Sequence, residues 1–148
     1  MSESVSSPPD LSLREQRQME RKHVVVISST DEFVGLIREL LIDERYNVTT
    51  TNFVARTYQQ IEALQPDLLM IDLVIQERAG WSLLDRLQTQ AITSDIPVVV
   101  TSTDHKLLEQ AEQNRREYTH SSKYVIQPFD IDILLATVEA LIGSADRA

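Results

Sequence analysis

Polar side chains stand directly behind several apolar runs of this sequence. Asp72 follows the run LLMI, Ser28 and Ser29 follow VVVI, Ser102 ends VVVTS, and Gln127 follows YVI. A carboxylate surrounded by hydroxyl and amide side chains could accept hydrogen bonds, take up a phosphoryl group, or supply one ligand to a hard cation such as Mg²⁺. Which of these it does depends on the residues that the fold brings around Asp72.

The spacing of the apolar residues predicts the elements that hold these side chains. From His23 onward, short runs rich in β-branched residues alternate with amphipathic stretches at helical spacing, as in successive βα units around a parallel sheet. The expected strands are Val24–Ile27, Val48–Thr51, Leu68–Asp72, Val98–Thr101 and Tyr124–Ile126. Val48–Thr51 is the most polar and suits an edge position. The predicted fold is therefore α/β, with a doubly wound, five-stranded parallel sheet.

Apolar stripes predict helices between the strands. One stripe begins at Phe33 after Asp31, which we expect to cap the helix N-terminus, and another begins at Ile131 after Asp130 and ends at Gly143. Three further helices are expected near 53–64, 82–91 and 104–118. Ligands of an open parallel sheet bind outside the carboxyl ends of its strands, so the polar residues named above should gather there.

The composition predicts one domain with a short leader and tail. Residues 1–22 begin with a Ser- and Pro-rich stretch that we expect to be disordered, followed by LSLREQRQMERK, which suits either a frayed leader or a docking helix. Residues 23–143 form the expected domain and 144–148 a tail. Met1 and the natural-looking tail favour a stand-alone chain.

Charge and residue usage exclude several classes of function. A net charge of -9 gives nucleic-acid phosphates nothing to attract them, and no apolar run is long enough to span a bilayer. The chain has no cysteine, and its three histidines lie far apart, so neither sulfur-ligated nor histidine metal sites are expected. We expect a protein of the cytoplasm that binds neither nucleic acid nor membrane.

Four motifs in order resemble the receiver domain of bacterial two-component response regulators. They are VVVISSTDEF, PDLLMID with Gly80 eight positions after the aspartate, IPVVVTS and YVIQPF, and the resemblance covers roughly His23 to Gly143. It implies the flavodoxin-like (βα)5 fold of that family. In that family, an acid pair holds Mg²⁺, an aspartate accepts phosphoryl, and a hydroxyl and a lysine bind the phosphoryl oxygens.

The resemblance places Asp72 at the phosphoacceptor position, Ser102 at the hydroxyl position and Tyr124 at the switch-aromatic position. The remaining positions depart from the family. Ser28 and Ser29 fall where the acid pair belongs, and Gln127 falls where the lysine belongs. Compared with the family pattern, this site therefore lacks two negative charges and one positive charge.

These departures lead us to expect weak or absent Mg²⁺ binding and no cofactor, because a serine hydroxyl is a poor substitute for carboxylate towards Mg²⁺. Asp31 is the remaining candidate metal ligand, although it lies two residues beyond the acid-pair positions, where a helix cap is the ordinary role. Asp72 is expected to be a structural acceptor of hydrogen bonds from Ser28, Ser102 or nearby N–H groups.

The leading prediction is an atypical single-domain response regulator, a pseudo-receiver without enzymatic activity that works through protein–protein contacts in a phosphorelay. Its expected partner is a histidine kinase or a downstream signalling protein that docks on the face formed by residues 104–142, with a homodimer as a further arrangement. The alternative is a true receiver that accepts phosphoryl on Asp72 from a histidine kinase. A flavodoxin-like ligand-binding protein or enzyme is a remote alternative, because none of the three glycines lies in the loop directly after the first strand, where a glycine-rich phosphate loop would be.

Overall fold

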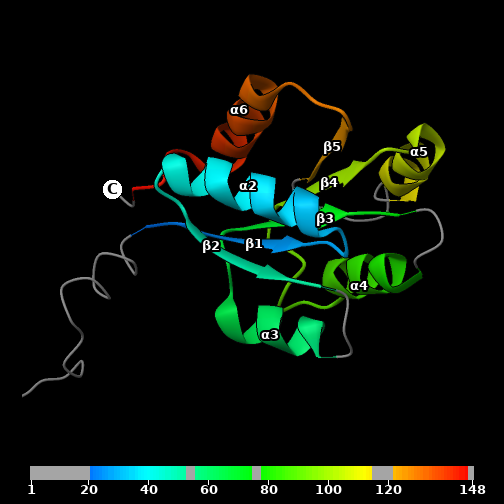
Figure 1. Ribbon diagram of the computed structural model, residues 1–148. Helices are drawn as coiled ribbons and strands as arrows, with labels where there is room; N and C mark the ends of the chain where they lie inside the picture. The colour runs from blue at the N-terminus through cyan, green and yellow to red at the C-terminus, as the bar shows by residue number, and fades with distance from the viewer. Residues whose placement is uncertain (1–20, 53–55, 75–77, 115–121, 147–148) are drawn as a thin grey trace, which may run out of the picture.

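The computed structural model describes residues 21–52, 56–74, 78–114 and 122–146, which form one parallel sheet between two layers of helices (Figure 1). The strand order is β2-β1-β3-β4-β5, so β2 lies at an edge as predicted. The strands are β1 (His23–Ile27), β2 (Asn47–Thr51), β3 (Leu68–Asp72), β4 (Val98–Ser102) and β5 (Ser122–Ile126). The doubly wound α/β fold is confirmed, with every strand within two residues of its expected bounds.

The helices divide between the two faces of the sheet. One face is covered by α2 (Asp31–Asp43) and α6 (Ile131–Ile142), and the other by α3 (Thr57–Leu64), α4 (Arg78–Thr89) and α5 (His105–Asn114) (Figure 1). The helix expected near 53–64 begins at Thr57, and residues 53–55 lie outside the described ranges. The part of the helix expected beyond Asn114 lies outside them as well. Among the described residues, no helix combines the length and apolar character needed to cross a membrane.

Strand side chains alternate between two hydrophobic cores. Val24, Val26 and Met70 pack towards α2 and α6, whereas Val25 and Ile71 pack towards the other three helices. Burying one such aliphatic side chain contributes about 1.5–3 kcal/mol. The same alternation decides on which face each polar side chain at the end of a strand projects.

The start of α2 corrects one prediction. The N-cap is Thr30, whose side chain makes no capping hydrogen bond, and Asp31 is the first residue of the helix itself. The prediction that Asp31 caps this helix is therefore wrong, although its charge still favours the positive end of the helix dipole. Asp130 is the N-cap of α6, and its side chain accepts a hydrogen bond from the Asp132 amide.

The segments before β1 and after α6 pack against each other. The Lys22 amide donates to the Ala145 carbonyl at 2.8 Å, and Ala145 is buried. Gly143 ends α6 at φ 78°, and a Cβ there would lie 3.0 Å from Lys22 Nζ. Lys22 and Ala145, which lie just outside the expected domain bounds 23–143, thus contact each other and belong to the packed structure.

Candidate functional site

Asp72 lies at the carboxyl end of β3, in the middle of the sheet, and is 5% exposed. Its side chain follows Leu68 and Met70 in the alternation and therefore projects towards the layer of α2 and α6. Ser28 follows Val26 onto the same face, and Thr101 is the partner of Asp72 in the register of β3 and β4. The parallel register thus brings these polar groups together beyond the core.

Three uncharged side chains donate hydrogen bonds to the Asp72 carboxylate. Ser28 Oγ donates to Oδ2 at 2.9 Å, and Gln127 Nε2 donates to Oδ1 at 2.8 Å. Thr101 Oγ1 makes a longer bond to Oδ1 at 3.4 Å and accepts from Gln127 Nε2 at 3.0 Å. The network joins the residues that follow β1 and β5 to β3 and β4, and both carboxylate oxygens take part.

The orientation of Ser28 is determined by a second contact. The Thr30 amide donates to Ser28 Oγ at 3.0 Å, so the hydroxyl oxygen is an acceptor towards the main chain. Its single proton is then directed at Asp72. This confirms the prediction that Ser28 donates to the aspartate.

Ser102 lies on the opposite face of β4. Its hydroxyl donates to the Leu73 carbonyl at 2.8 Å and accepts from the Asp104 amide at 3.0 Å. A hydroxyl has one proton to donate, so of the two serines offered as alternative donors to Asp72, Ser28 fills that role and Ser102 does not. The physical reason is the alternation of the strand, which turns Thr101 towards Asp72 and Ser102 away from it.

Tyr124 shares the Ser102 face of the sheet. It is partly buried and packs against the core beneath α3, α4 and α5. The structure therefore separates the predicted site residues into two groups. Ser28, Asp72 and Gln127 are joined with Thr101, while Ser102 and Tyr124 lie on the other face of the sheet.

The remaining two candidates, Ser29 and Asp31, are exposed beside this network. Within the described ranges, no group of three or more His, Cys, Asp or Glu side chains is placed to hold a metal ion. The donors around Asp72 are hydroxyl and amide groups, whereas Mg²⁺ is usually held by carboxylates with phosphate oxygens and water. This set of residues is a poor fit for Mg²⁺.

Thr101 is the site residue that the sequence reasoning missed. The expected strand Val98–Thr101 ends at this position, and only the residues after it were expected to reach the site. The signal that could have found it is the pairing of Asp72 with Thr101 across β3 and β4, because paired residues project on the same face.

Comparisons with known proteins agree with this architecture. The family model for the response regulator receiver domain matches residues 24–139. A curated relative, the DNA-binding dual master transcriptional regulator RpaA of Synechocystis sp., is 34% identical over 57% of this chain and 34% of its own length. The chain spans from about a third to about half of the length of such curated relatives.

Solved structures of similar fold have low sequence identity. Vibrio cholerae chemotaxis protein CheY4 superimposes with a TM-score of 0.69 at 15% identity, over 82% of this chain and 98% of that one. The receiver domain of the Pseudomonas aeruginosa sensor histidine kinase PA1611, which holds a magnesium ion in its active site cleft, has a TM-score of 0.66 at 18% identity, over 84% and 99%. At these identities the likeness concerns the fold alone.

Proposed function

The chain belongs to the response regulator receiver domain family, and on that premise we propose that it is a degenerate receiver. In this proposal it takes part in two-component signalling by binding other proteins, and it takes up no phosphoryl group on Asp72. It performs no enzymatic reaction of its own. The support comes from the residues around the aspartate.

The observation that carries the proposal is the hydrogen bonding of the Asp72 carboxylate. Ser28 and Gln127 donate to different oxygens, at 2.9 and 2.8 Å. Each bond draws electron density from an oxygen that would have to attack a phosphoryl donor, and it places a side chain against that oxygen. Phosphoryl transfer also needs positive charge to neutralise the charge that develops, and the side chains at the acid-pair and lysine positions are uncharged. The site therefore supports a hydrogen-bonded aspartate better than an aspartyl phosphate.

Weak or absent Mg²⁺ binding is part of the proposal. Ser28 Oγ already accepts the Thr30 amide and donates to Asp72, so a metal would have to break this arrangement. A neutral hydroxyl offers little to offset the dehydration of Mg²⁺. Asp31 is the acid that would have to compensate, and it lies exposed in the first turn of α2.

A phosphorylatable receiver is the second candidate function. Asp72 lies at the end of the central strand, where the family resemblance places the phosphoacceptor, and Ser102 lies at the end of the neighbouring strand. In that case Gln127 would have to turn away from the carboxylate, and a histidine kinase would supply the phosphoryl group.

Intact mass separates the two candidates. The full chain is incubated with Mg²⁺ and a small-molecule phosphodonor, beside an active receiver as positive control and Asp72→Asn as the matched variant. The proposal predicts no phosphoryl adduct on the wild-type chain while the positive control is labelled. A phosphoryl adduct on the wild-type chain that is absent from Asp72→Asn would establish the second candidate.

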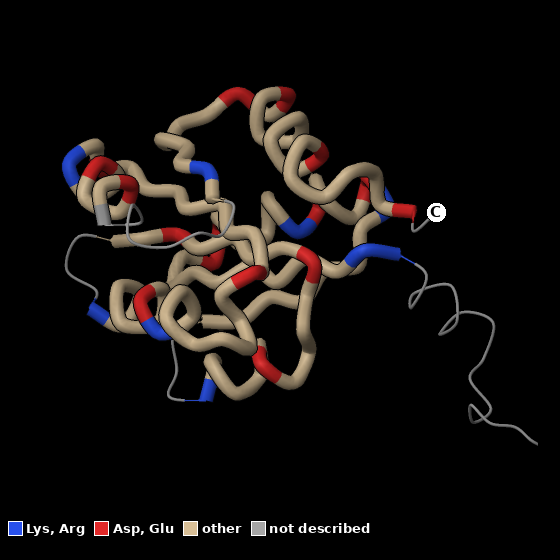
Figure 2. Tube along the Cα trace, turned by 180° about the vertical axis from the view of Figure 1, so that it is seen from behind, with Lys and Arg blue, Asp and Glu red and all other residues tan. Residues whose placement is uncertain are grey.

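The partner in this proposal is a protein, either a histidine kinase or a downstream signalling protein, that docks in the cytoplasm on the face of residues 104–142. Ile131 and Ile133 support this surface, because they leave 43% and 59% of their area exposed on α6. Nucleic acid is disfavoured by the charge of α6 and of α2, which covers the same face of the sheet as α6 (Figure 2). These two helices carry one basic residue, Arg38. Their acidic residues are Asp31, Glu32, Glu39, Asp43, Asp132 and Glu139.

Self-association through the same face is the other arrangement in the proposal. Replacing Ile133 with lysine would place a charge in the middle of this contact. Light scattering of the wild type and Ile133→Lys over a range of concentrations tests it. A wild-type dimer that Ile133→Lys separates would support self-association through α6, and a dimer unaffected by the change would exclude that surface.

A further inference from the structure

A groove separates the edge strand β2 from α3. Its volume is about 340 Å³, which lies at the lower end of the range for ligand pockets. Val25 and Ile61 form its buried floor, and Thr49 and Thr51 line it from the strand. None of its lining residues is charged. An occupant that suits this groove is therefore apolar and close to neutral.

The groove is open because α3 is short and β2 is polar. The helix has 8 residues, whereas α2 on the opposite face has 13. Small threonine side chains stand where the inner strands carry larger aliphatic ones. Leu64, at the last turn of α3, consequently leaves 45% of its area exposed at the rim.

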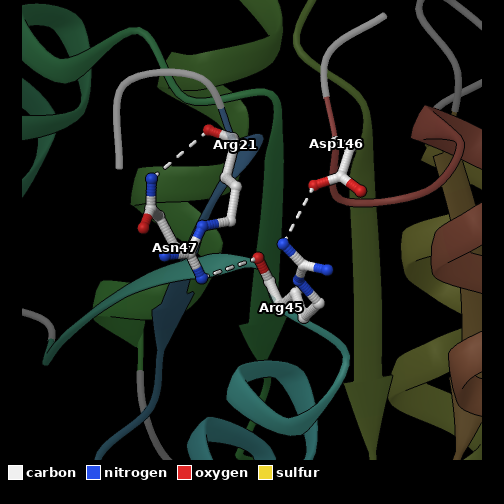
Figure 3. A network of polar contacts seen from close by, with 4 residues as sticks. All are labelled: Arg21, Arg45, Asn47 and Asp146. Carbon is white, nitrogen blue, oxygen red and sulfur yellow. Dashed lines mark hydrogen bonds and ion pairs between the residues drawn. The ribbon is translucent and has the colours of Figure 1, made fainter. Parts of the chain in front are cut away.

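The described chain begins beside this groove. The Asn47 side chain donates to the Arg21 carbonyl at 3.3 Å, and Arg21 also reaches the Arg45 carbonyl (Figure 3). These contacts hold Arg21 at the start of β2. His23 Nε2 lies 2.6 Å from the hydroxyl of Thr49, one of the groove residues. The segment that precedes Arg21 thus joins the domain within a few residues of the groove.

That segment has suitable chemistry and sufficient length. Residues 11–20, LSLREQRQME, contain three apolar side chains, Leu11, Leu13 and Met19, and equal numbers of basic and acidic ones. An extended chain reaches up to about 3.5 Å per residue, so Leu13 can lie as far as about 28 Å from Arg21. The strand from Asn47 to Thr51 is only about 13 Å long. The segment also lies outside the residues that match the receiver family.

We infer that residues 11–20 dock in the groove between β2 and α3 and bury Leu13 and Met19 against Ile61 and Leu64. The neutral segment meets an uncharged groove, so docking removes apolar surface from water without desolvating an ion pair. The leader then protects the one edge of the sheet that is lined with threonines. This docking is independent of whether Asp72 accepts a phosphoryl group.

Disulfide trapping tests the inference, since the chain has no cysteine of its own. The full chain carrying Leu13→Cys and Leu64→Cys is oxidised at low concentration, and the matched control carries Leu13→Cys and Ile42→Cys. Ile42 is equally exposed, at 43%, but lies on α2, three residues from the Arg45 that Arg21 contacts. A freely moving segment would meet Ile42 at least as readily as Leu64.

The inference predicts an intramolecular disulfide to Leu64→Cys that forms at least roughly tenfold faster than the one to Ile42→Cys, because docking raises the effective concentration. Equal rates, or a faster reaction at Ile42→Cys, would overturn it. A disulfide that joins two chains would assign the groove to a second copy instead and overturn the inference as stated.

Hydrogen exchange supplies a second readout without new cysteines. In the full chain with Leu11→Ser, Leu13→Ser and Met19→Ser, amides of α3 should exchange several-fold faster than in the wild type, while those of α2 stay unchanged. Unchanged exchange in α3 would contradict the docking.

Discussion

The carboxyl and amino ends of the sheet differ in the burial of their polar contacts. At the carboxyl end, a buried carboxylate accepts hydrogen bonds from neutral side chains, and Asp72 and Thr101 are 5% and 0% exposed. At the amino end, Arg45 pairs with Asp146 at 3.7 Å, with the side chains 69% and 64% exposed. The difference indicates that the Asp72 network makes its end of the sheet rigid, whereas the Arg45–Asp146 pair is a contact that water and salt can readily replace.

The largest effect should come from Gln127→Leu. This change removes the donor to both Asp72 and Thr101 and leaves the buried carboxylate with fewer partners. We expect the free energy of unfolding to fall by about 3 kcal/mol, measured by urea denaturation. Gln127→Lys retains N–H donors and should cost less. A loss under roughly 0.5 kcal/mol for Gln127→Leu, as at an exposed ion pair, would break the contrast between the two ends.

Ser28→Ala should have the next largest effect. It removes the donor to the other carboxylate oxygen, but the Thr30 amide that it also frees is near solvent and can bond to water. The expected loss is about 2 kcal/mol in the same denaturation experiment. Ser29→Ala is the matched control, because Ser29 is exposed, and it should leave the free energy of unfolding almost unchanged.

Tyr46→Phe removes a partly buried hydrogen bond at the amino end of the sheet. Tyr46 Oη donates to the Gly143 carbonyl at 2.7 Å, and losing this bond should cost about 1 kcal/mol. Burial raises the pKa of the Tyr46 phenol above its usual value, and Glu139 and Glu44 raise it further. The unfolded chain then ionises first, so stability is retained below about pH 10 and falls as the pH rises further.

The pH dependence is tested by measuring the free energy of unfolding of both proteins between pH 8 and pH 11. Tyr46→Phe should lose stability less steeply than the wild type above about pH 10. Parallel losses in the two proteins would show that another group governs the alkaline range.

The smallest effect should come from Asp146→Asn. It removes the ion pair with Arg45, and because both side chains are mostly exposed, the free energy of unfolding should change by no more than about 0.5 kcal/mol. Thermal unfolding at low and high salt is the measurement. A change as large as that of Ser28→Ala would mean that the amino end is as tightly held as the Asp72 end.

Much of the fold can be predicted from the local pattern of apolar and polar residues. The alternation of apolar runs and amphipathic stretches predicted all five strands and the edge position of β2, because a parallel sheet covered on both faces leaves that signal in the sequence. Counting from the first strand also placed Ser28 beside Asp72. The strand prediction depends on residues close together in the chain, whereas the placement of Ser28 joins residues 44 positions apart and depended on the family resemblance.

The remainder depends on how distant segments meet. The bond from Thr101 to Asp72 and the turn of Ser102 towards Leu73 depend on the register between β3 and β4, which the sequence pattern did not define to a single residue. The contact of Lys22 with Ala145 joins residues from the two ends of the chain. No local periodicity encodes any of these three contacts.

Restoring the charges that the site lacks would test the central claim most directly. The measurement is intact mass after incubation with Mg²⁺ and a phosphodonor, made on the wild type and on Ser28→Asp/Ser29→Asp/Gln127→Lys, each with Asp72→Asn as control. The account predicts a phosphoryl adduct on the restored variant and none on the wild type, because only the charges around Asp72 differ. Equal labelling of the two proteins at Asp72 would contradict it.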